Sequence, residues 1–215
     1  MHGARRTRCP VRVDIWSDIV CPWCYIGMAR FERALERFNA PVTIALHPFQ
    51  LDPEAPIPGE PARERYRRRF GGEADAMMKR IEDEARTLSL PIDWNRAITA
   101  NTFDAHRAIY YARRSELDRA LEERLFRAYF AEGLDVSDRS LLADLAGELG
   151  LVRGDVAAYL ESDDGVDEVR VELAGAFDRG ITAVPSFLFE DEFLVPGAVD
   201  ELTMLRILEQ MRAVT

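Results

Sequence analysis

The sequence predicts an α/β domain that is interrupted by a long, all-helical insertion. Hydrophobic side chains alternate with polar ones near both ends of the chain, and a period of two is typical of strands. Between these ends, over residues 61–179, hydrophobic side chains recur at helical spacing instead. We therefore expect residues 11–60 and 180–215 to form one α/β domain and residues 61–179 to form the insertion.

The first three elements follow one another closely. Residues 11–16 alternate as a strand, residues 25–39 carry a hydrophobic face at helical spacing, and residues 42–47 alternate again. Pro41 and Pro48 interrupt the chain after the predicted helix and after the predicted second strand. A strand–helix–strand unit of this length favours two parallel strands joined by a right-handed crossover.

The remaining elements are predicted from the same two periods. Residues 51–61 are rich in proline and read as an exposed connection. The insertion is expected to contain six or seven helices with no strand between them. Strands then return at residues 181–189 and 193–195 as a hairpin, and a helix is predicted over residues 199–211.

Length and charge limit the possible functions. The chain has 215 residues, of which 47% are hydrophobic, so it can bury a core without disulfides or metals. A net charge of -10 disfavours a surface for nucleic acid or anionic membrane, and no stretch approaches the roughly 18 apolar residues of a membrane span. The basic residues 1–10 lack the apolar core of a secretory signal. We expect a cytoplasmic protein.

The tetrapeptide CPWC at residues 21–24 lies between the first strand and the first helix, where paired cysteines carry out redox chemistry. Cys21 is predicted to be the nucleophile, because unpaired amides and the helix dipole at a helix start favour a thiolate. Cys24 would attack the resulting mixed disulfide and release the product. Pro22 supports this geometry, since proline costs nothing in a first helical turn.

Two other interpretations of the pair are weaker. A structural zinc site needs four ligands, and the rest of the sequence offers only Cys9 and the histidines at positions 2, 47 and 106. We therefore expect no bound metal. An inert disulfide would close too short a loop to stabilise the fold much. Cys9 precedes the first strand and is expected to be an incidental thiol.

Five blocks of sequence, in order along the chain, carry a family resemblance; they are SDIVCPWCYIG at 17–27, HPFQLDP at 47–53, NTFDAHR at 101–107, AYFAEG at 128–133 and GITAVPSFLFEDEFLVPGA at 180–198. They resemble the DsbA family of thiol–disulfide oxidoreductases, and within it the FrnE-like branch related to 2-hydroxychromene-2-carboxylate isomerase. The resemblance covers residues 11–212. It implies a thioredoxin fold that is split by the all-helical insertion domain.

The resemblance also implies roles for individual residues. Cys21 matches the nucleophilic cysteine and Cys24 the resolving one. Pro185 matches a proline whose peptide bond is cis and which faces the active-site disulfide, and the backbone of Val184 would bind an extended substrate chain. Trp23 offers an aromatic face for substrate contact, with packing over the loop as the alternative.

Three further polar residues are weaker candidates. Asp18 could orient the loop or accept a proton, although an acidic residue here also suits a turn. His106 shares a helical face with apolar residues, which favours a hydrogen-bonded core histidine over a catalyst. His47, at a strand end, is a comparable candidate, and Asn101 and Thr102 are explained as caps of the helix that follows.

The predicted function is reduction, oxidation or isomerisation of protein or peptide disulfides by the CPWC pair. No resident cofactor is expected, and glutathione is a candidate co-substrate. The alternative is a glutathione-dependent isomerase or transferase acting on a small aromatic or polyketide-like molecule, although relatives of that kind place a serine at the reactive position. A module that only binds zinc or a partner is a third hypothesis. We expect a monomer or a homodimer.

The alternative depends on a ligand cleft in the insertion. The candidates to line a cleft opposite the CPWC motif are large side chains of the insertion, namely Tyr66, Met77, Phe103, Tyr110 and Tyr129. Some of them are expected to line the cleft and most to belong to the ordinary core.

Overall fold

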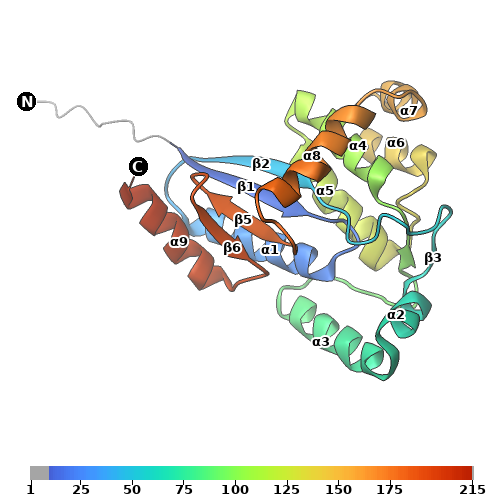
Figure 1. Cartoon of the computed structure of the whole chain (residues 1–215), viewed down its shortest axis with the longest axis horizontal. Helices are drawn as coiled ribbons and strands as arrows, with labels where there is room; N and C mark the ends of the chain where they lie inside the picture. Colours follow the sequence, from blue (N-terminus) through green and yellow to red (C-terminus); the bar gives the residue numbers. More distant parts are fainter. Residues whose placement is uncertain (1–9, 215) are drawn as a thin grey trace, which may run out of the picture.

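The computed structural model describes residues 10–214 and contains a four-stranded sheet with helices on both of its faces (Figure 1). Its strands are β1 (Val11–Ser17), β2 (Val42–Pro48), β5 (Ser186–Phe189) and β6 (Phe193–Pro196), in the order β2-β1-β5-β6. β1 and β2 are parallel, β5 is antiparallel to β1, and β6 is antiparallel to β5. Strands from the two ends of the chain thus share one sheet.

The two faces of the sheet have separate cores because side chains alternate along a strand. Val13 and Ile15 of β1 belong to the main core, together with side chains of α1 (Pro22–Arg37) and α9 (Glu201–Val214). Trp16 belongs to a smaller cluster with Ala176 of α8 (Val166–Asp178). The sheet is therefore covered by α1 and α9 on one face and by α8 on the other.

The insertion is mostly helical, as predicted, and apart from α8, which covers a face of the sheet, it lies toward one end of the sheet (Figure 1). Besides α8 it contains α2 (Ala62–Phe70), α3 (Ala74–Thr87), α4 (Phe103–Ala112), α5 (Asp118–Arg127), α6 (Arg139–Glu148) and α7 (Arg153–Glu161). The chain continues from α5 into a π-helical turn at Ala128–Glu132. None of the helices within residues 10–214 has the length and apolar character needed to cross a bilayer.

Two details differ from the sequence prediction. The strand expected over residues 181–189 begins only at Ser186, because the preceding residues form a loop beside the CPWC motif, where Pro185 has no amide hydrogen for the sheet. The insertion was expected to contain no strand, but β4 (Ile98–Thr99) pairs with β3 (Glu60–Pro61). Strands of two residues are too short to show a period.

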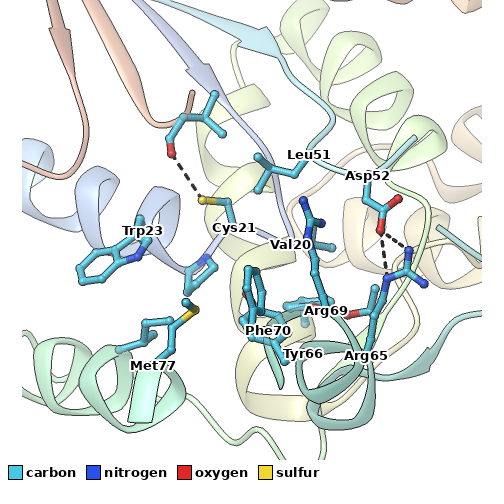
Figure 2. Close-up of a pocket in the computed structure, with 15 residues that line it drawn as sticks. Val20, Cys21, Trp23, Leu51, Asp52, Arg65, Tyr66, Arg69, Phe70 and Met77 are labelled. Carbon is cyan, nitrogen blue, oxygen red and sulfur yellow. Dashed lines mark hydrogen bonds and ion pairs between the residues drawn. The ribbon is translucent and has the colours of Figure 1, made fainter. Parts of the chain in front are cut away.

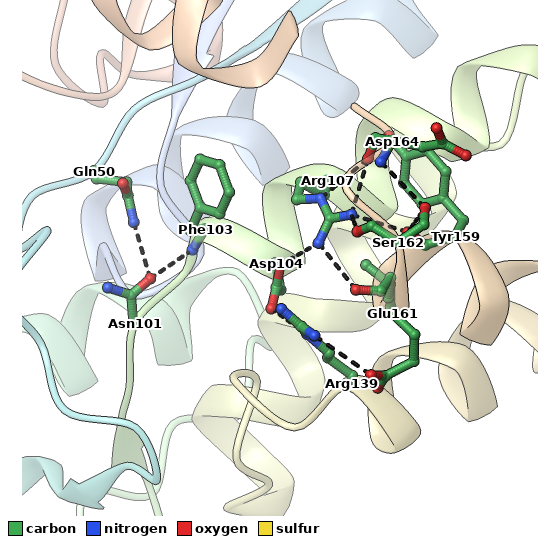
Figure 3. Close-up of polar contacts among 11 residues, drawn as sticks. Gln50, Asn101, Phe103, Asp104, Arg107, Arg139, Tyr159, Glu161, Ser162 and Asp164 are labelled. Carbon is green, nitrogen blue, oxygen red and sulfur yellow. Dashed lines mark hydrogen bonds and ion pairs between the residues drawn. The ribbon is translucent and has the colours of Figure 1, made fainter. Parts of the chain in front are cut away.

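The NTFDAHR segment is explained largely by structure. Asn101 accepts a hydrogen bond from the amide of Phe103, whereas the Thr102 side chain makes no capping bond, so of the two predicted caps only Asn101 caps the helix. Arg107 is buried and pairs with Asp104 at 2.7 Å (Figure 3). Its guanidinium also donates to main-chain carbonyls at the end of α7, namely those of Tyr159, Leu160, Ser162 and Asp164. This arginine fastens α4 to the α7–α8 turn.

Candidate active site

The CPWC motif opens α1 as predicted. Cys21 is the N-cap residue, and its carbonyl accepts hydrogen bonds from the amides of Cys24 and Tyr25 at 3.0 and 3.2 Å. Pro22 occupies the first helical position, where its missing amide hydrogen leaves no partner unsatisfied. The Cys21 sulfur thus lies at the positive end of the helix dipole.

The two thiols are unequally placed. Both cysteines are free, but only Cys21 lines a cleft, whereas Cys24 is completely buried beneath it. Burial raises the pKa of the Cys24 thiol, and the hydrogen bond and charge of Cys21 raise it further. Cys21 can therefore be reached from the cleft, whereas burial favours the protonated form of the Cys24 thiol.

The loop before β5 completes the surroundings of Cys21. The Val184–Pro185 peptide bond is cis, which confirms the prediction from the family resemblance. The Cys21 thiol donates to the Val184 carbonyl over 3.6 Å, drawn as a dashed line in Figure 2. The approach of this loop to α1 needs a glycine, since a Cβ atom at Gly27 would lie 2.8 Å from Cγ of Pro185.

The cleft beside Cys21 has a volume of about 260 Å³ and mostly apolar walls (Figure 2). The motif contributes Trp23, which is half-buried, and the guanidinium of Arg80 lies 5.6 Å from the centre of its ring. The opposite wall comes from the insertion and includes Tyr66, Phe70, Met77, Ile81 and Tyr129. Three of the five candidate side chains, Tyr66, Met77 and Tyr129, therefore line the cleft. Phe103 and Tyr110 line other hollows of the surface, because α4 turns them away from the motif.

The polar groups of the cleft were not predicted from the sequence. Arg65 donates to Asp52 at 2.9 Å and to Glu60 at 2.7 Å. Arg69 also lines the cleft, yet no carboxylate of residues 10–214 lies within ion-pair distance of its guanidinium. The signal in the sequence is the spacing: Arg65 and Arg69 lie four residues apart on α2, as do Tyr66 and Phe70 beside them.

Asp18 and His106 lie together behind the motif rather than in the cleft. Asp18 is fully buried and accepts a hydrogen bond from the Leu51 amide at 2.7 Å. Its other oxygen lies 3.5 Å from Nε2 of His106, which donates to the Phe49 carbonyl at 2.9 Å. His106 is thus a hydrogen-bonded core histidine, and the two residues hold the chain at positions 49–51 against the loop that carries Cys21.

Glu122 was also missed, because a glutamate on an amphipathic helix resembles a surface residue. Its carboxyl is buried, and burial raises its pKa to about 7 against a smaller opposing effect of Ser17. His47 belongs to a different cluster, where it bonds Asp14 at 2.7 Å and stacks on Trp16. Within residues 10–214 no three His, Cys, Asp or Glu side chains gather as a metal site would require.

Comparison with known proteins agrees with this geometry. The family model described as the DSBA-like thioredoxin domain matches residues 12–209. A probable DsbA oxidoreductase from Streptomyces coelicolor is 31% identical, with a TM-score of 0.89 over 95% of this chain and 91% of its own. YwbO of Bacillus subtilis is 28% identical over 87% of this chain and 90% of its own. A 2-hydroxychromene-2-carboxylate isomerase, 19% identical, shares the fold with a TM-score of 0.69 over 95% of this chain and 99% of its own.

Proposed function

The chain belongs to the DSBA-like thioredoxin domain family, and on that premise we propose that it is an oxidoreductase or isomerase of protein and peptide disulfides that uses the CPWC pair. The observation that carries this proposal is the position of the Cys21 sulfur. It lies at the start of a helix, in a cleft, next to a backbone carbonyl and above a second, buried thiol.

The chemistry runs in two displacement steps. In the first, the Cys21 thiolate attacks one sulfur of a substrate disulfide; a bond forms between Cys21 and that sulfur, and the other half leaves as a thiolate that takes up a proton. In the second, Cys24 loses its proton and attacks the Cys21 sulfur. The Cys21–Cys24 disulfide forms and the remaining half of the substrate leaves as a thiol. Two electrons have passed from the protein to the substrate.

The return of the protein to its starting state needs an external thiol. Glutathione or a second dithiol protein would serve, and no resident cofactor takes part in either step. The same steps run in reverse if the Cys21–Cys24 disulfide is the form that meets the substrate. We place this reaction in the cytoplasm, where reducing thiols are abundant. The acting protein would be a monomer or a homodimer.

Titration in glutathione redox buffers, read by mass spectrometry after alkylation, tests the redox pair. We expect a single two-electron transition with loss of two protons, confined to Cys21 and Cys24. A Cys24→Ser variant should accumulate mixed disulfides on Cys21, because attack survives and resolution does not. Trapping of partners by a Cys21→Ser variant through Cys24 would reverse the assignment of the two roles.

The second candidate function is a glutathione-dependent isomerase of a small aromatic molecule. The apolar cleft favours it, because Trp23, Tyr66 and Phe70 could pack against an aromatic ring. Cys24 counts against it, since isomerisation needs no resolving thiol. A Cys21→Ser variant separates the two functions: it should lose all disulfide chemistry, and only an isomerase of this kind would retain turnover of an aromatic substrate.

A further inference from the structure

The cleft carries positive charge although the whole chain has a net charge of -10. Arg65 and Asp52 largely cancel each other across its rim. Arg69 remains without a carboxylate among residues 10–214, and Arg80 adds a second positive charge above the Trp23 ring. A cation at the mouth of an otherwise apolar cleft is a binding group for an anion.

The direction of the Arg69 side chain agrees with this role. Figure 2 shows it extending from α2 across the cleft toward Leu51, on the Cys21 side of the Asp52–Arg65 pair. Its neighbour Arg68 does not line the cleft and pairs with Glu60. The two adjacent arginines therefore differ in their partners. Arg68 faces a carboxylate outside the cleft, whereas Arg69 lines the cleft with its guanidinium 5.5 Å from the centre of the Phe70 ring, which leaves its charge available to an anion.

We propose that the cleft selects small disulfides that carry a carboxylate close to the sulfur, and that Arg69 binds this carboxylate. The proposal rests on the function proposed above and names its substrate class. A guanidinium suits a carboxylate because it can donate two parallel hydrogen bonds. The apolar walls would contact the carbon chain between carboxylate and sulfur, and a volume of about 260 Å³ suits a small ligand.

The charge of Arg69 also bears on the first chemical step. An anionic substrate is repelled by the Cys21 thiolate that must attack it, and a nearby cation offsets this repulsion. The bonds that form and break are those described above. The carboxylate stays on the half of the substrate that it occupies and is released with that half as a thiol.

The test uses three disulfides with equal two-carbon arms: bis(2-carboxyethyl), bis(2-hydroxyethyl) and bis(2-aminoethyl) disulfide. For each disulfide the rate with the variant is divided by the rate with the parent, so that differences in intrinsic reactivity among the three disulfides cancel. We expect Arg69→Gln to lower kcat/KM for the dicarboxylate about tenfold, to leave the neutral disulfide unchanged and to raise the rate of the diamine. Arg69→Lys should keep most of the preference.

Arg68→Gln is the matched control, since it removes the same charge from the same helix outside the cleft. If Arg68→Gln and Arg69→Gln lower kcat/KM for the dicarboxylate equally, the effect comes from the overall charge of the helix and not from a binding group in the cleft, which would overturn the proposal. An equal fall for all three disulfides would also overturn it, as would a parent enzyme that reduces insulin but none of the three.

Failure of the proposed function itself is recognised separately. The Cys21→Ser protein retains Arg69 and has no redox chemistry, so calorimetry with the dicarboxylate measures binding alone. Loss of binding on adding Arg69→Gln supports the carboxylate site even if no disulfide is reduced. Equal binding with arginine and glutamine at this position refutes it.

Discussion

The two thiols and the walls around them come from different regions of the molecule. Cys21 and Cys24 are held by α1 on the sheet, and most of the cleft that faces them is built by α2, α3 and the turn that carries Tyr129. In the proposed reaction the sheet region supplies the reacting thiols, and the insertion would supply the contacts that select a substrate. Changes in the first region should abolish the chemistry, whereas changes in the second should alter stability or selectivity.

The largest effect is expected at the nucleophile. Cys21→Ser should reduce insulin-disulfide reduction to the uncatalysed background, a loss of more than about 10³-fold, because no other thiol of residues 10–214 lines the cleft. The thermal unfolding curve should stay close to that of the parent. Cys9 lies outside the described residues, and Cys9→Ser is the control for loss of a thiol, expected to keep full activity. Residual turnover by the Cys21→Ser protein would refute a single nucleophile.

A large effect on stability alone is expected at Arg107 in the insertion. Arg107→Met leaves Oδ1 of Asp104 and several carbonyls without their donor, while Arg139 still bonds Oδ2, so we expect a loss of about 3–5 kcal/mol in urea unfolding. Arg86→Met, at an exposed ion pair, should cost less than about 1 kcal/mol. The Cys21–Cys24 titration should be unchanged below the unfolding transition, and a shifted titration would mean that the two regions are not separable.

Glu122 lies where the sheet region and the insertion meet, and it should make the stability of the folded protein depend on pH. Its buried carboxyl has a pKa of about 7, above the ordinary 4.5, so the folded protein binds its proton more tightly than the unfolded chain. Stability should therefore fall as pH rises from about 4.5 to about 7. Its neighbours are Ser17 on β1, His106 on α4, and the more distant Asp118 and Glu32.

A Glu122→Gln variant has no proton to lose at this position. At pH 8 it should be more stable than the parent, by up to about 3 kcal/mol, and at pH 4.5 the two should be nearly equal. Glu123→Gln, on the next position of the helix, is the control. If the free energy of unfolding changes with pH in the same way for Glu122→Gln and the parent, ionisation of Glu122 does not destabilise the folded protein, and the prediction is wrong.

The smallest effect is expected at the exposed edge of the cleft. Phe70→Ala removes part of an apolar wall, so KM for a small disulfide should rise about threefold while kcat stays the same. Leu202→Ala, at another exposed apolar side chain, which lies on α9, should change neither KM nor kcat. A fall in kcat at Phe70→Ala would mean that the wall acts on the reacting sulfur and not only on binding.

The division between the sheet region and the insertion also separates what could be predicted from the sequence from what could not. Alternation in β1 and β2 and the helical face of α1 depend on neighbours in the chain, and those elements and the position of the CPWC motif at the start of α1 were predicted correctly. A helical period shows that a face is buried but not against which neighbour, so it could name Phe103 as a candidate for the cleft although Phe103 lies elsewhere.

Charged side chains were harder to predict for a related reason. Arg69 and Arg68 are adjacent residues of one type, and only the fold places Glu60 beside one and the cleft beside the other. Glu122 shows the opposite error, since the pattern of polar residues on α5 contains nothing that marks a carboxyl as buried. Partners contributed by distant segments decide the role of a charge.

The contact between Cys21 and Val184 joins residues that are 163 positions apart, and it has a consequence for the protein during its synthesis. The CPWC segment leaves the ribosome long before β5 exists to pair with β1. Until the final segment arrives, Cys21 lacks its contact with Val184 and β1 lacks one of its neighbouring strands. The order of translation thus produces both thiols well before the segment that completes their surroundings.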